Sequence, residues 1–236
     1  MGMAARIFRS FPPALKHELQ RIRYRYLIRK GQFRSDEREY DLVEKLIGSG
    51  DVVVDIGANV GYYTLQFSRL VGQKGMVISF EPITRTFDLL SSNVFCANCE
   101  NVTLINTVIS KEAGTVGFTV PKGNYFQAHI SEEGELRRMA IPLNLFDQPQ
   151  WGPDFMKIDA EGMDMAIITS SVEYMNRHRP VIMVELGLED LMHARSLLDQ
   201  YTAYSLRESH NGFLVPMEQE SNFLSRLELT ELERRP

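Results

Sequence analysis

The sequence predicts an α/β protein with a mostly parallel sheet and helices on both faces. From residue 52 onward, short β-branched runs alternate with helical patterns, and strands separated by a helix pair in parallel. These runs are apolar without alternation, as in strands that are buried on both faces. The 236 residues, 44% hydrophobic and 24% charged, suit one domain or one domain with an appendage.

The chain is expected to be cytoplasmic. No apolar run approaches the length of a membrane span, and the N-terminus lacks the compact apolar region of a signal peptide. We predict three regions, namely a basic helical extension over residues 1–34, a main domain over 35–216 and a C-terminal helix or tail over 217–236.

The N-terminal extension is strongly basic. Residues 1–38 hold ten lysines and arginines against three acidic residues, whereas the whole chain has a net charge of −5. Pro12 and Pro13 would start a helix that Gly31 can end, with an apolar stripe on one face made of Leu15, Leu19, Ile22 and Tyr26. We expect this stripe to dock on the acidic body. The alternative is an arm that binds nucleic acid, a membrane surface or a phosphorylated substrate. Ser35 would then cap a second helix.

The main domain is expected to hold seven strands. Strands are predicted at 52–56, 76–80, 102–106, 155–158, 181–184, around 204–206 and around 213–215. Residues 111–150 fit no simple strand–helix unit. Strand patterns at 114–120 and 139–143 predict a β insertion there.

The first strand leads into a glycine-containing turn where a ligand is expected to bind. Asp55 ends the strand, and Gly57 and Gly61 allow the backbone to approach a ligand beside the N–H groups of the next helix. A phosphate-binding loop needs a lysine after its second glycine, and a dinucleotide fingerprint needs a middle glycine where Asn59 stands. Both of these phosphate-binding interpretations are therefore weakened.

This turn resembles motif I of the class I methyltransferases, in the form D-x-G-A-N-x-G. With Phe80-Glu81-Pro82 and the run from Lys157 to Gly162, the chain resembles the FkbM family of methyltransferases over roughly residues 39 to 190. The resemblance implies a Rossmann-like fold and S-adenosylmethionine as cofactor. FkbM relatives act on hydroxyls of sugars, polyketides and similar metabolites, so we predict O-methylation of a small-molecule hydroxyl.

The resemblance also indicates where the cofactor binds. Gly57 and Gly61 would admit its methionine part, Asp55 and Asn59 would orient the amino and carboxylate ends, and Glu81 would hold the ribose hydroxyls. The adenine is expected against Val108 and Ile109, because no acidic residue stands near that position. The predicted cofactor residues are Asp55, Gly57, Ala58, Asn59, Gly61, Tyr62, Glu81, Pro82, Val108, Ile109 and Asp159.

Further carboxylates follow the later strands and should reach the same edge of the sheet. Asp159 and Glu161 are the predicted catalytic residues, because clustered carboxylates can have raised pKa values and act as bases. The structural alternative is that Asp159 and Glu161 cap the next helix and pair with Lys157. The predicted substrate residues are Tyr125, Phe126, His129 and Glu185, although an exposed loop histidine explains His129 equally well. No spacing indicates a metal site.

Two other functions stay open. A nucleic-acid methyltransferase or binding protein would use the basic arm, but the Asn/Asp-Pro-Pro-aromatic motif of enzymes that methylate base amines is absent. A nicotinamide-dependent oxidoreductase would share the ribose carboxylate, but the glycine pattern and a tyrosine–lysine pair are missing. We expect a hydroxyl-bearing small molecule as partner, consider nucleic acid unlikely and leave a homo-oligomer open.

Overall fold

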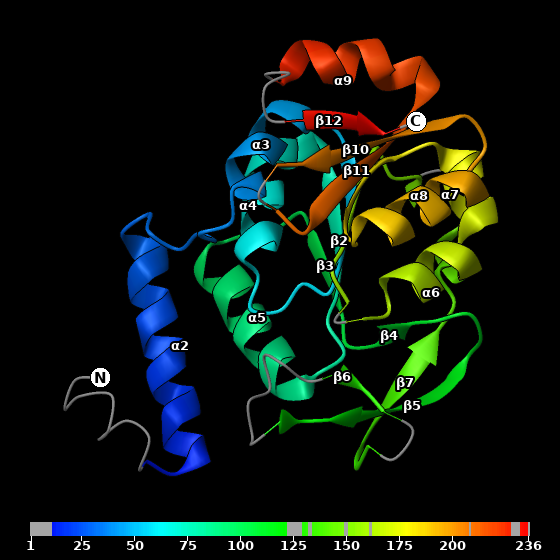
Figure 1. The fold of residues 1–236 in the computed structure, drawn as a ribbon. Helices are drawn as coiled ribbons and strands as arrows, with labels where there is room; N and C mark the ends of the chain where they lie inside the picture. The colour runs from blue at the N-terminus through cyan, green and yellow to red at the C-terminus, as the bar shows by residue number, and fades with distance from the viewer. Residues whose placement is uncertain are drawn as a thin grey trace.

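The protein is built around one large mixed sheet (Figure 1). The computed structural model describes residues 11–121, 129–131, 134–148, 151–160, 162–207, 209–227 and 232–235. The strand order is β12-β10-β11-β9-β8-β1-β2-β3. Their bounds are β1 Val52–Ile56, β2 Met76–Phe80, β3 Val102–Ile105, β8 Phe155–Ile158, β9 Val181–Glu185, β10 Tyr201–Leu206, β11 Asn211–Pro216 and β12 Leu232–Arg235.

The predicted fold class is confirmed, with one strand more than expected. Strands β9, β8, β1, β2 and β3 run parallel, and β11, β10 and β12 add to the β9 side in antiparallel fashion. The extra strand β12 lies in the predicted tail. Its four residues include a single apolar side chain, Leu232, so the sequence carries no strand pattern there.

Helices cover both faces of the sheet. Each face of the sheet packs against its own hydrophobic core. Side chains along a strand alternate between the faces, so Val53 belongs to one core and Val54 to the other. The first face carries α3 Glu39–Leu46, α4 Tyr62–Val71 and α9 Glu220–Arg226, with α5 Thr84–Cys96 beside α4. The second carries α6 Asp164–Ser170, α7 Val172–His178 and α8 Leu188–Leu197.

The predicted β insertion forms a small separate sheet at the carboxyl ends of the parallel strands. Its strand order is β4-β7-β5-β6, with bounds β4 Val108–Ile109, β5 Gly114–Thr119, β6 His129–Ile130 and β7 Leu136–Ile141. Strand β4 follows β3 almost directly, which places the small sheet below the large one in Figure 1. Val108, Phe118 and Ala140 form its core with Ile83 from the main domain.

The N-terminal helix α2, Pro13–Arg29, forms as predicted but docks through a different face. The expected stripe faces solvent, because Leu15, Ile22 and Tyr26 are 43%, 62% and 58% exposed. On the docked face His17 and Arg21 contact Asp88 of α5. Tyr24 is buried there as well.

The docked face of α2 is fixed by an aromatic cluster that no helical pattern reveals. The ring centroid of Tyr24 lies 5.4 Å from that of Phe33, and Phe33 stacks on Tyr62 of α4 at 4.4 Å. The second helix begins later than predicted, at Glu39. Ser35 lies in the preceding turn, where its hydroxyl oxygen accepts a hydrogen bond from the Glu37 N–H.

Candidate functional site

The turn after β1 packs closely against the carboxyl ends of β2 and β8, the strands on either side of β1. Gly57, Asn59 and Gly61 all have positive φ values, of 79°, 50° and 94°. The N–H groups of Gly57 and Ala58 both donate to the Phe80 carbonyl at the end of β2. A Cβ atom on Gly57 would collide with the carbonyl oxygen of Asp159 at the end of β8. Only glycine fits this position.

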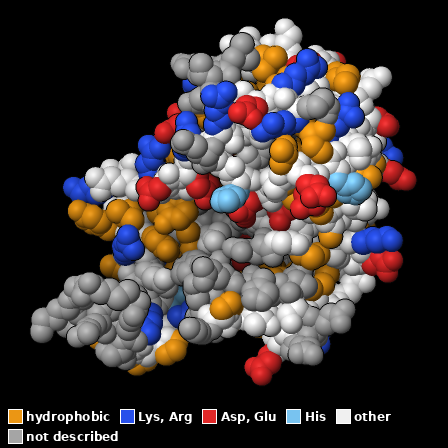
Figure 2. All heavy atoms as spheres, in the orientation of Figure 1, with side chains coloured by type: hydrophobic (Ala, Val, Ile, Leu, Met, Phe, Trp, Pro, Cys, Tyr) orange, Lys and Arg blue, Asp and Glu red, His pale blue; other side chains and the backbone are white. Residues whose placement is uncertain are grey.

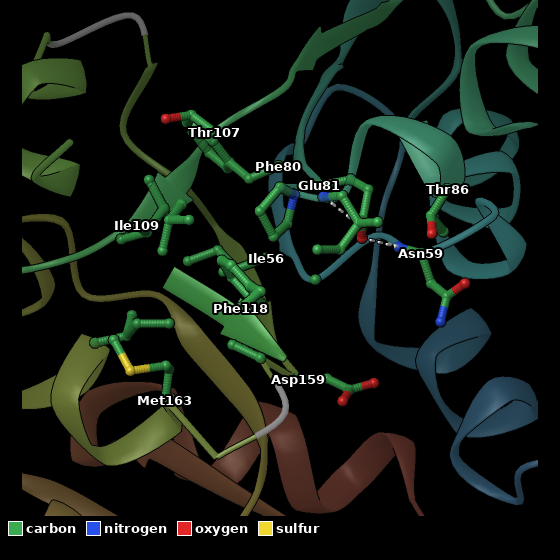
Figure 3. Close-up of a pocket in the computed structure, with 16 residues that line it drawn as sticks. Ile56, Asn59, Phe80, Glu81, Thr86, Thr107, Ile109, Phe118, Asp159 and Met163 are labelled. Carbon is green, nitrogen blue, oxygen red and sulfur yellow. Dashed lines mark hydrogen bonds between the residues drawn. The ribbon is translucent and has the colours of Figure 1, made fainter. Parts of the chain in front are cut away.

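The end of β2 delivers Glu81 to the same edge. Its two carboxylate oxygens accept hydrogen bonds from the Asn59 and Ile83 N–H groups, each at 2.9 Å (Figure 3). The residue is 5% exposed. Burial raises the pKa of Glu81 to about 7, despite these two hydrogen bonds, and the charges of Asp55 and Asp159 add to the rise. Glu81 therefore changes its charge near neutral pH.

A first cavity opens beside Glu81, with about 670 Å³ of empty space that includes its open mouth. Phe118 of the small sheet and Met163 before α6 supply apolar walls (Figure 3). The predicted cofactor residues that line it are Gly57, Asn59, Glu81, Pro82, Val108, Ile109 and Asp159. Val108 and Ile109 belong to β4, so the small sheet forms one side of this cavity.

A second cavity lies on the other side of the turn, with about 760 Å³ of empty space that also includes its open mouth. It shares Gly57, Asn59 and Asp159 with the first cavity, and Ala58 and Tyr62 line it as well. The remaining wall comes from residues N-terminal to β1, namely Tyr24, Ser35 and Glu37, and from Val60, Tyr63 and Lys157. The two cavities therefore meet at the glycine turn and Asp159.

Two predicted cofactor residues line neither cavity. Asp55 is fully buried behind the turn, where its carboxylate accepts a hydrogen bond from the Thr64 hydroxyl at 2.6 Å. Burial raises the pKa of Asp55, and nearby Lys157 and Thr64 oppose the rise. At Gly61 a Cβ atom would lie 2.6 Å from Leu90 Cδ1. Both residues shape the turn from behind, whereas the sequence predicts that they contact the ligand.

Lys157 and Asp159 form a charged pair where the cavities meet. Lys157 Nζ donates to Asp159 Oδ2 at 2.8 Å and lies 5.0 Å from the Tyr63 ring centroid. Burial opposes the charge of Lys157, but Asp159 and Asp55 outweigh it and raise the pKa of the lysine. Burial likewise opposes ionisation of Asp159, yet Lys157 and a hydrogen bond with Glu185 lower its pKa. Asp159 is thus a carboxylate at neutral pH.

From the sequence, Lys157 is expected only as a structural partner of Asp159. A lysine inside the apolar strand Phe155–Ile158 is itself a signal, because a buried charge needs a partner at the strand end. Beside it, the Tyr63 hydroxyl donates to Glu37 at 2.7 Å. Glu37 precedes β1 in the sequence. No sequence pattern predicts that it lies beside Tyr63 and Lys157.

The remaining site predictions are only partly tested by the geometry. Glu185 ends β9 and shares a hydrogen bond with Asp159, so these two predicted residues do lie together. Glu161, Tyr125 and Phe126 lie outside the described residues. His129 belongs to β6 and pairs with Thr119, but its side chain is not among those described. Within the described part of the chain, no three or more His, Cys, Asp or Glu side chains form a group that could hold a metal ion.

The parallel strands, the glycine turn after β1 and the carboxylate that ends β2 define a class I methyltransferase domain. A family model described as the methyltransferase FkbM domain matches residues 55–211. The chain belongs to this family, as its three motifs predict, and its domain is that of an S-adenosylmethionine-dependent methyltransferase. Among the described residues, no helix is both long and apolar enough to cross a membrane.

Individual relatives are distant. The chain is 26% identical over 131 residues to protein-L-isoaspartate O-methyltransferase of Caenorhabditis elegans, covering 50% of this chain and 56% of that protein. Methyltransferase FkbM from Methylobacillus flagellatus KT superposes with a TM-score of 0.54 at 16% identity, covering 70% of this chain and 43% of that one. For an S-adenosylmethionine-dependent O-methyltransferase from Thermotoga maritima the TM-score is 0.47 at 15% identity, with 72% and 52% covered. The chain thus spans about half the length of each of these three proteins.

Proposed function

We propose that this protein transfers the methyl group of S-adenosylmethionine to a hydroxyl oxygen of a small-molecule metabolite. The observation that carries the proposal is the junction of the two cavities at Gly57, Asn59 and Asp159. S-adenosylmethionine is elongated, with its sulfonium between adenosine and methionine. With adenosine in the first cavity and methionine in the second, the reactive methyl group would lie near the residues that both cavities share, which include Asp159.

The side chains of the first cavity suit adenosine. Each oxygen of Glu81 accepts one N–H, which leaves further lone pairs for ribose hydroxyls. Pro82, Val108 and Ile109 offer apolar walls for a flat base. The methionine end has polar partners as well, because Asn59 Oδ1 is buried and accepts no hydrogen bond from the described residues. A ligand ammonium group would satisfy that oxygen, and Glu37 adds a negative charge to the same cavity.

Asp159 is suited to orient a hydroxyl acceptor. The bound cofactor supplies an electrophilic methyl group, so the protein needs mainly to align the acceptor and accept its proton. Lys157 keeps Asp159 ionised, and the carboxylate accepts a hydrogen bond from the acceptor hydroxyl, which points an oxygen lone pair at the methyl group. A carboxylate with a lowered pKa is a weak base, so the proton would move to it only as the carbon–oxygen bond forms and the carbon–sulfur bond of the cofactor breaks, which would leave S-adenosylhomocysteine.

Two measurements test this proposal. Mass spectrometry of the ligand that stays bound through purification should find S-adenosylmethionine or S-adenosylhomocysteine. The protein is then incubated with a cell extract and a donor carrying a ¹³C-labelled methyl group, and the products are examined by NMR. We expect a methoxy carbon in a small-molecule fraction. Label in N-methyl groups or in the RNA fraction would contradict the proposed acceptor.

Cofactor affinity is expected to rise with pH through neutrality. Ribose hydroxyls donate to Glu81, so the ionised carboxylate binds better, and its pKa of about 7 leaves little of that form in mildly acidic solution. Calorimetry should therefore give affinity about tenfold higher near pH 8 than near pH 6. The variant Glu81→Gln should bind more weakly at the higher pH and show no such slope. An equal slope in the variant would assign the titration to another group.

Methyl transfer is expected to be independent of metal ions. The sulfonium already activates the methyl group, and Lys157 supplies the positive charge beside Asp159. Turnover should stay the same after treatment with a chelator and after addition of Mg²⁺. A loss on chelation that Mg²⁺ restores would show that the acceptor is held through a cation.

A further inference from the structure

Helix α2 has a second, outer face that no described element covers. Leu15, Leu19, Ile22 and Tyr26 follow each other at intervals of three and four residues, which places them in one stripe along the helix. Three of the four are exposed, and Leu19 is half-buried. The docked face, with His17, Arg21 and Tyr24, lies on the opposite side. The stripe is therefore directed away from the body.

Basic side chains flank this stripe on both edges. At 100° per residue, Arg25 and Arg29 lie on one edge, together with Glu18, which pairs with Arg21 at 3.6 Å, and Arg23 and Lys30 lie on the other. All four basic side chains on these edges are exposed, and none forms an ion pair with another described residue. Lys30 Nζ lies 6.0 Å from the ring centroid of Tyr26. In Figure 2, hydrophobic and basic side chains lie together at the edge of the molecule where Figure 1 places α2.

We propose that this outer face, made of the stripe and the four basic residues, binds an anionic membrane surface. An apolar stripe between two basic edges is the pattern of helices that lie in a lipid interface. The apolar side chains enter the acyl boundary, while arginine and lysine extend their long stems to the lipid phosphates. The domain would then be held on the membrane without spanning it.

The other occupants fit this face less well. Nucleic acid would pair with the arginines but would leave Leu15, Leu19 and Ile22 against phosphate. A second copy of the chain, packed face to face about a twofold axis, would bring the arginine edges of both copies together, and like charges repel. Of the three surfaces compared, only an anionic lipid surface offers both hydrocarbon and negative charge.

The test is flotation of the full chain with lipid vesicles. We expect binding to vesicles of phosphatidylcholine with phosphatidylglycerol, little binding to phosphatidylcholine alone, and weaker binding as salt increases. The double variants Ile22→Asn/Tyr26→Asn and Arg25→Gln/Arg29→Gln should each lower binding about tenfold or more. Their thermal unfolding should match that of the unchanged protein, since all four side chains are exposed.

Matched variants elsewhere on the surface serve as controls. Leu145→Asn removes an exposed apolar side chain, and Lys74→Gln/Lys111→Gln removes two exposed charges. Both should bind vesicles normally. The proposal fails if the full chain ignores anionic vesicles or if the controls lose as much binding as the α2 variants. It also fails if the α2 variants instead abolish retention on homopolymer RNA or convert a dimer to a monomer without changing vesicle binding.

Discussion

Replacing Gly57 with alanine is expected to abolish detectable binding of S-adenosylmethionine. The added Cβ atom would overlap the carbonyl oxygen of Asp159, and a φ of 79° is unfavourable for alanine. Backbone on both sides of the overlap must move, so the turn shifts between the two cavities that it separates. Calorimetric titration with the cofactor measures the loss.

Gly50→Ala is the matched control for this variant. Gly50 has a φ of 98°, so alanine meets a similar conformational strain there, but nothing lies within 4 Å of the added atom. Residue 50 also precedes β1, whereas the two cavities lie beyond the carboxyl end of that strand. Gly50→Ala should be slightly less stable and bind cofactor normally. If Gly57→Ala stays folded and binds equally well, the turn does not form the cofactor site.

Replacing Lys157 with methionine is expected to remove most turnover and to destabilise the protein. Methionine matches the lysine stem in size but leaves Asp159 without its charged partner. Breaking a buried pair in this way costs about 3 kcal/mol, at the low end of the usual range because 31% of the Asp159 side chain is exposed. Urea unfolding gives the stability. The rate of methyl transfer at saturating cofactor gives the catalytic effect.

A double variant separates these two effects. In Lys157→Met/Asp159→Asn the unpaired charge is gone, so much of the lost stability should return. Turnover should remain low, because the amide is a far weaker proton acceptor than the carboxylate. Recovery of turnover together with stability would mean that the pair only supports the fold.

The predictions that agree best with the structure are those that depend on local sequence pattern. Strands β1, β2 and β8 have the predicted bounds, because apolar runs and glycines mark their ends. The cluster of Gly57, Asn59, Glu81 and Asp159 followed from the rule that parallel strands end at one edge.

What the sequence could not predict depends on tertiary partners. The apolar stripe of α2 was the best guide to its docked face, yet Asp88 of α5 and the rings of Phe33 and Tyr62 select the opposite face. Asp55 ends its strand like Glu81, but Thr64 and the tight turn enclose it. The second cavity needs Tyr24 and Glu37, whose approach to Lys157 follows only from the docking of the N-terminal segment.

Strand β4 is part of the small sheet and also forms one wall of the first cavity. Val108 and Ile109 line the first cavity, and their backbones pair with Ala140 and Ile141 of β7. The small sheet has two strands of only two residues each, and so few strand residues give little independent stability. A ligand that packs against β4 therefore adds its binding free energy to the stability of the small sheet. If the cofactor binds in the first cavity as proposed, its binding should raise the free energy of unfolding of the small sheet.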